Sequence, residues 1–132
     1  MTSALFFNMQ KDVSIQIEKE QVETGENLNC VVRINYSGRF DSVVINSQIE
    51  NSSDVFKYIN LNGKKIIHPY ARLSLLKQDI PDVRKVEFTV TTLHVPSNDN
   101  SNAKFRVSII QEHKEITSDI AYLKILKKTN LA

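Results

Sequence analysis

The chain has 132 residues, of which 41% are apolar and 24% are charged, and its 17 basic and 15 acidic side chains leave a net charge of +2. This composition is typical of one folded domain and excludes a disordered chain. The near balance of charge argues against a nucleic-acid-binding domain, which needs a strongly basic face. No apolar run approaches the ~20 residues that cross a bilayer, so we predict no membrane span.

Two features favour a cytoplasmic location. Residues 1–11 lack the positive start and the ~7–15 apolar residues of an export signal, and we interpret them as an N-terminal extension. Cys30 is the only cysteine, so the fold does not depend on an internal disulfide or on the oxidising compartment in which such bonds form.

From residue 12 onward, apolar residues recur at every second position, which is the period of a strand with one buried face. In chain order, this alternation predicts strands within 12–18, 27–36, 42–50, 55–61, 70–79, 83–93, 103–110 and 116–126. In the second of these, Cys30 shares a face with Leu28 and Val32, which predicts an inert core cysteine. In the last segment, 116–126, apolar residues occur at both even and odd positions, which predicts either a bulge or contacts on both faces.

Turn-forming residues separate these segments. Asn62-Gly63 is the clearest example, because both residues tolerate the positive φ of a type I′ hairpin turn. Short alternating segments divided by such turns predict an all-β fold, a single antiparallel β-sandwich of seven or eight strands over 12–128.

Two stretches resemble known β-sandwich families. Residues 17–50, IEKEQVETGENLNCVVRINYSGRFDSVVINSQIE, resemble the opening hairpin and following strand of arrestin-like domains. The matching positions are Gly25, Glu26, Leu28, Cys30, Val32, Val43, Ile45 and Ile49. Residues 103–126 resemble the last two strands of immunoglobulin-like sandwiches, which a short turn separates. The resemblance covers about half of the chain, and it implies a sandwich fold and the peptide- or cargo-binding role of arrestins.

The sequence contains none of the short motifs of nucleophilic, phosphate-binding or zinc enzymes. His68, His94 and His113 have no second ligand at a metal-binding spacing, so we expect each to be solvated. Asp99 lies in a polar stretch without the order of a calcium loop. We therefore predict no enzyme, no cofactor and no metal site. A hydrolase would need a pocket in which several titratable groups converge, and a short sequence motif is not required for such a pocket.

Binding has more support from the segment 55–72. Phe56 and Tyr58 alternate with Val55, Ile59 and Leu61, so both faces of this strand are apolar, as at a contact surface. Basic residues follow around the Asn-Gly turn. The predicted partner-binding residues are Phe56, Tyr58, Lys64, Lys65, Tyr70 and Arg72.

Two functions are consistent with this segment. The first is a non-enzymatic protein-interaction module that binds a protein partner or a second copy of itself through an open strand edge. The alternative is an accessory domain that binds nucleic acid or phosphate through the basic hairpin 57–72. In a third interpretation, the lysines of this segment protect a sheet edge from pairing with another chain.

Overall fold

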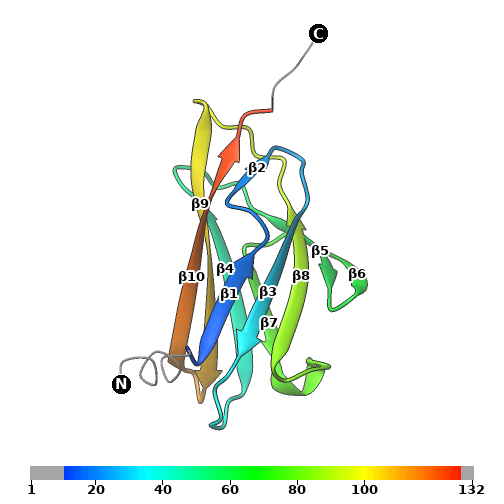
Figure 1. Ribbon diagram of the computed structural model, residues 1–132, viewed down its shortest axis with the longest axis vertical. Coiled ribbons are helices and arrows are strands. Elements are labelled where there is room, and N and C mark those ends of the chain that lie inside the picture. Colours follow the sequence, from blue (N-terminus) through cyan, green and yellow to red (C-terminus); the bar gives the residue numbers. More distant parts are fainter. Residues whose placement is uncertain (1–10, 129–132) are drawn as a thin grey trace, which may run out of the picture.

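The computed structural model describes residues 11–128, which form two five-stranded sheets packed face to face (Figure 1). The strand order is β1-β3-β8-β5-β6 in one sheet and β2-β10-β9-β4-β7 in the other. The strands are β1 (Val13–Ile17), β2 (Gln21–Glu23), β3 (Leu28–Ile34), β4 (Ser42–Ile49), β5 (Lys57–Leu61), β6 (Lys64–His68), β7 (Arg72–Leu76), β8 (Lys85–Thr91), β9 (Asn100–Gln111) and β10 (Lys114–Leu126). A single 3₁₀ turn, η1 (Lys77–Asp79), is the only helical element of the part described.

Ten strands lie within 11–128, so the expected number of seven or eight was too low. The two additions are β2, which is too short to show a period, and β6, whose sequence KKIIH does not alternate. The expectation of purely antiparallel pairing was also wrong, because β2 runs parallel to β10. The chain reaches this position by passing from one sheet to the other between β1 and β2.

The core lies between the sheets and follows the predicted alternation. In β3, alternate residues from Leu28 to Ile34 are buried against the facing sheet. In β9, Phe105, Val107 and Ile109 are buried in the same way. A two-residue turn at Glu112 and His113 then joins β9 to β10, as expected for the last two strands. Ile116 has no partner in the β9–β10 register, so a bulge lies there. The register is regular beyond it, and Tyr122 is exposed on the face opposite to the buried Leu123.

Cys30 is a core residue, as predicted, with 2% of its surface exposed. Burial raises the pKa of its thiol to about 12, so the nucleophilic thiolate is scarce at neutral pH. We expect a disulfide reagent such as DTNB to leave Cys30 unmodified in native protein and to titrate one thiol in urea. Cys30→Ala should cost on the order of 1 kcal/mol of stability. Fast reaction of the native thiol would contradict this prediction.

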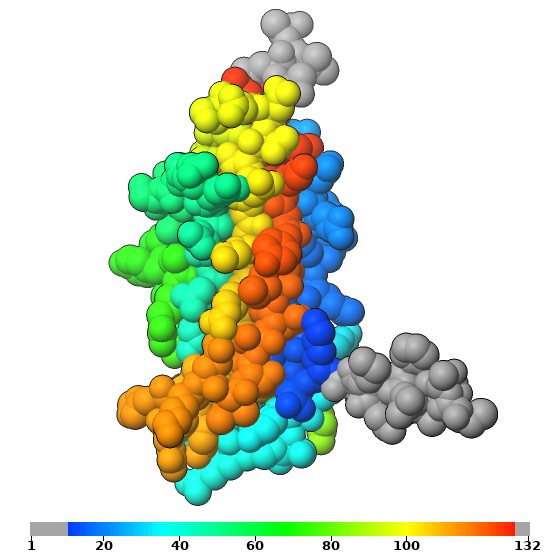
Figure 2. All heavy atoms as spheres, turned by 90° about the vertical axis from the view of Figure 1, so that its left-hand side faces the viewer, coloured from blue at the N-terminus to red at the C-terminus, as the bar shows by residue number. Residues whose placement is uncertain are grey.

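One side of the sandwich is closed where β1 approaches β10, the side that Figure 2 views. Asp119 of β10 accepts hydrogen bonds from the Ile15 backbone N–H (3.0 Å) and from Lys11 Nζ (2.7 Å). This carboxylate therefore joins an edge strand of one sheet to a strand of the other. On the opposite side, formed by β6 and β7, a hydrogen bond from His68 to the Arg72 carbonyl links the two edge strands at one end.

The predicted boundary between an extension at 1–11 and a domain at 12–128 stays a prediction, because residues 1–10 lie outside the described part. Within 11–128, no helix has the length and apolarity needed to cross a bilayer.

Candidate functional site

Two of the six predicted binding residues lie in the core. Phe56 is 1% exposed and Tyr58 is fully buried, so the expectation that both face a partner was wrong. The Phe56 ring lies 4.9 Å from the Phe105 ring and the Tyr58 ring 5.6 Å from the Phe88 ring, measured between centroids. Phe105 belongs to β9 of the other sheet, so its contact with Phe56 joins the two sheets, whereas Tyr58 and Phe88 lie on neighbouring strands of one sheet.

A bulge explains why the faces of β5 were misassigned. Between Tyr58 and Asn60, the register of β5 against β8 shifts by one residue, so Ile59 is the extra residue. Tyr58 and Leu61 consequently both pack on the core, although simple alternation places them on opposite faces. Apolar residues at both parities therefore reflect a bulge rather than a two-faced contact surface.

The other four predicted residues are exposed along one side of the sandwich. Lys64 and Lys65 begin β6, Tyr70 is in the loop after β6 with 64% of its surface exposed, and Arg72 begins β7. β6 and β7 are edge strands of different sheets on this same side. We call this surface the β6–β7 side.

β6 is a guarded edge. Its residues Ile66 and Ile67 oppose the single residue Ile59 of β5, which places a bulge in the edge strand itself. Figure 1 shows the resulting β5–β6 hairpin projecting from the body of the domain. Bulges and lysines are two devices that prevent an edge strand from pairing with another chain. The bulge agrees with the third interpretation, in which Lys64 and Lys65 guard β6, and that role of the lysines stays a prediction.

β7 is a regular edge without these protections. Ser47 N–H donates to Ala71 O and Lys77 N–H donates to Asp41 O, each at 2.9 Å, which sets the phase of the β4–β7 ladder. Alternate residues of an antiparallel strand bond to the neighbour. The backbone groups of Arg72, Ser74 and Leu76 consequently face away from β4, where no strand pairs with β7 within 11–128.

His68 connects the two edges at one end. Its Nε2–H donates to the Arg72 carbonyl at 2.7 Å, and its ring packs edge-on against Tyr70 with 5.3 Å between ring centroids. The expectation of a solvated histidine was wrong for His68, which is half-buried, and holds for His113, which is exposed in a turn. The contact occupies the Arg72 carbonyl, whereas the outward backbone groups of Ser74 and Leu76 pair with no strand of residues 11–128.

Large apolar side chains are exposed on the β6–β7 side, and two of them were not predicted from the sequence. Ile67 and Leu76 are among the large apolar residues with high exposure, together with the predicted Tyr70. Leu76 was not predicted because its segment alternates as a strand with one buried face does. Beside β6, an open groove of about 800 Å³ on the outer face of the sheet includes Ile59, Ile66 and Ile67 in its lining.

The four exposed predicted residues of the β6–β7 side are basic or aromatic. Lys64, Lys65, Tyr70 and Arg72 offer positive charge and one aromatic ring, with no carboxylate or cysteine among them. Within residues 11–128, no three His, Cys, Asp or Glu side chains gather as a metal site would require.

No family model matches the chain, and no curated protein matches it either. Solved structures do resemble it. The adhesin CfaE of enterotoxigenic E. coli has a TM-score of 0.58 and 11% identity over 92% of this chain, which spans about half (49%) of that adhesin chain. The reeler domain of human F-spondin has a TM-score of 0.53 and 10% identity over 89% of each chain. These likenesses show a shared all-β fold.

An enzyme also has this fold. AvmM, which catalyses macrocyclization in alchivemycin A biosynthesis, has a TM-score of 0.52 and 8% identity over 92% of this chain and 93% of its own. The fold therefore does not separate binding domains from enzymes, and function has to be argued from the residues of the chain itself.

Proposed function

We propose that this domain, an immunoglobulin-like or arrestin-like sandwich, is a protein-interaction module that accepts an extended strand along β7. The observation that carries the proposal is the regular, uncovered edge of β7, with outward backbone groups at Ser74 and Leu76. Main-chain hydrogen bonds to such an edge provide affinity, and neighbouring side chains provide specificity. Tyr70 and Leu76 are exposed beside this edge and provide apolar contact area.

A second copy of the chain is the occupant with the best support. Antiparallel pairing of two β7 strands about Ser74 sets Arg72 of one copy opposite Leu76 of the other. Pairing in this direction joins two five-stranded sheets into one and removes both exposed edges.

The phosphate-binding alternative has less support. Lys64 and Lys65 begin β6 in one sheet, whereas Arg72 begins β7 in the other, so the three charges do not follow a single strand. Phosphate contacts weaken steeply as salt rises. A complex held by backbone pairing and apolar contact should respond little to salt, which separates the two functions.

The test is the solution mass by light scattering over a concentration series, at low and high salt. We expect wild-type protein to dimerise at high salt and Ser74→Pro to be monomeric, because proline removes an outward N–H and leaves the β4 ladder intact. Ser74→Thr keeps the N–H and is the matched control, which should dimerise. A wild-type monomer at every concentration, or a Ser74→Pro dimer of wild-type strength, would contradict self-pairing through β7.

A further inference from the structure

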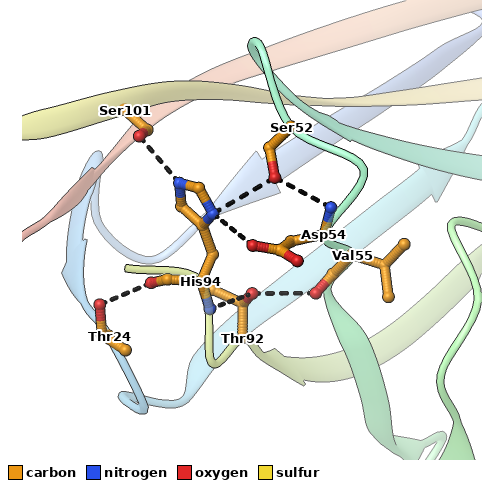
Figure 3. A network of polar contacts seen from close by, with 7 residues as sticks. All are labelled: Thr24, Ser52, Asp54, Val55, Thr92, His94 and Ser101. Atoms are coloured by element: carbon orange, nitrogen blue, oxygen red, sulfur yellow. Dashed lines mark hydrogen bonds and ion pairs between the residues drawn. The ribbon is translucent and has the colours of Figure 1, made fainter. Parts of the chain in front are cut away.

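A polar network occupies one end of the sandwich, away from the β6–β7 side, and it centres on His94 (Figure 3). The expectation that His94 is solvated was wrong, because only 9% of this residue is exposed. Its Nδ1 lies 2.8 Å from Asp54 Oδ2, and its Nε2 lies 2.9 Å from Ser101 Oγ. The three residues come from the β4–β5 loop, the segment after β8 and the start of β9.

The partners of the ring determine which nitrogen carries the proton. An ionised carboxylate only accepts hydrogen bonds, so His94 Nδ1–H donates to Asp54. In the neutral ring, Nε2 then keeps its lone pair and accepts the hydroxyl proton of Ser101. The hydrogen bond from His94 lowers the pKa of Asp54, which keeps this carboxylate in its acceptor form.

The backbone on both sides of the ring is held in place. Thr24 Oγ1 donates to the His94 carbonyl at 2.6 Å, and the His94 N–H donates to Thr92 Oγ1 at 3.1 Å. The Thr92 hydroxyl in turn donates to the Val55 carbonyl at 2.9 Å. Because these bonds join three segments, the imidazole is oriented before any ligand arrives.

Space for a ligand adjoins His94 and Ser101. A cavity of about 360 Å³ has both His94 and Ser101 in its lining, together with Asn98, Asn100 and the acidic residue Glu50. Side-chain amides are among the groups that stabilise the oxyanion of acyl transfer. The lining is mostly small and polar, and its volume suits a short acyl group.

We propose that Ser101, His94 and Asp54 form a nucleophilic site that accepts the acyl group of small carboxylic esters. A serine, a histidine and a carboxylate in this order of hydrogen bonds are recognised by geometry, whatever their order in a chain. The order here is Asp54, His94, Ser101, without a G-x-S-x-G motif, so no sequence pattern reports it. This site is independent of the β7 edge.

The reaction conserves atoms and charge. Ser101 Oγ attacks the ester carbonyl carbon while its proton moves to His94 Nε2, and a tetrahedral oxyanion forms. The bond to the leaving oxygen then breaks, and Nε2 returns the proton to that oxygen, which leaves acyl-Ser101 and an alcohol. Water attacks the acyl group by the same proton route and releases the carboxylic acid and free Ser101.

The exposure of Asp54 determines how much its carboxylate contributes to the rate of acyl transfer. Its side chain is 58% exposed, so solvent screens its interaction with the ring more than in a buried relay. We therefore expect Asp54→Asn to lower the rate about tenfold, which is well short of the ~10⁴-fold loss seen where the carboxylate is buried.

The experiment uses p-nitrophenyl acetate, with nitrophenolate release and intact-protein mass as readouts. We expect wild-type protein to carry an acetyl group on Ser101. In Ser101→Ala and His94→Gln, the rate of nitrophenolate release should fall to the rate that free imidazole gives. Ser53→Ala is the matched control, because Ser53 is an exposed serine next to the network and is not bonded to His94. Circular dichroism verifies that each variant is folded.

Acetylation of Ser101 that depends on His94 supports the site. An unchanged rate in Ser101→Ala, or acetyl groups confined to lysines, overturns it. Should His94→Gln unfold, Asp54→Asn and Ser101→Ala decide the question, because they alter exposed or half-buried groups and preserve the ring.

Discussion

Replacing Phe56 by serine should destabilise the domain more than any surface change. The Phe56 ring is buried between the sheets against Phe105, and removing such a ring costs about 3–5 kcal/mol. The serine hydroxyl adds to this cost wherever it lacks a partner. Since a typical domain is stable by about 5–15 kcal/mol, the urea midpoint should fall by a large fraction.

Tyr70→Ser is the matched control for this prediction. Tyr70 is the predicted binding aromatic that the structure does place on the surface, so its loss should change stability by less than about 0.5 kcal/mol. Urea unfolding followed by circular dichroism measures both variants. Equal stability of Phe56→Ser and wild type would mean that Phe56 faces solvent, as the sequence suggested.

Loss of the Asp119 carboxylate should loosen the closed side of the sandwich. Asp119→Ala leaves the Ile15 N–H and Lys11 without their acceptor, and we expect a loss of about 1–3 kcal/mol at neutral pH. Asp119→Asn keeps an acceptor oxygen and removes only the charge, so its loss should be smaller. Urea unfolding at pH 7 compares the three proteins.

The same comparison at low pH tests the electrostatic part. Burial acts to raise the pKa of Asp119, but hydrogen bonds from Lys11, Ile15 and Ile120 outweigh it and leave this pKa lowered. A carboxyl whose pKa is lowered on folding stabilises the protein above its unfolded pKa of about 4 and loses this contribution as pH falls through the folded value. The difference between wild type and Asp119→Ala should therefore shrink below about pH 4. A constant difference from pH 7 to pH 3 would contradict this.

Much of the fold could be predicted from local pattern. β3 keeps a strict period of two because one face packs on the core, and β9 follows the same period apart from the buried Ser108. The buried apolar residues of both strands were the expected ones. The turn at Asn62 and Gly63 was also predicted and has positive φ at both residues. The cytoplasmic location stays a prediction.

The candidate sites were harder to predict from the sequence than the strands, for two physical reasons. A bulge shifts the parity of every residue beyond it, and the bulge at Ile59 moved Tyr58 and Leu61 to one face. The parallel pairing of β2 with β10 depends on contacts between segments about 100 residues apart, which no local window contains.

The sequence by itself determined the fold class, the burial of Cys30 and the positions of the main turns, because each depends on neighbouring residues in the chain. Only the tertiary structure decided which strand edge is open and which histidine is buried. Asp54, His94 and Ser101 span 48 residues and carry no motif, so their meeting depends on how two sheets stack rather than on any spacing in the chain.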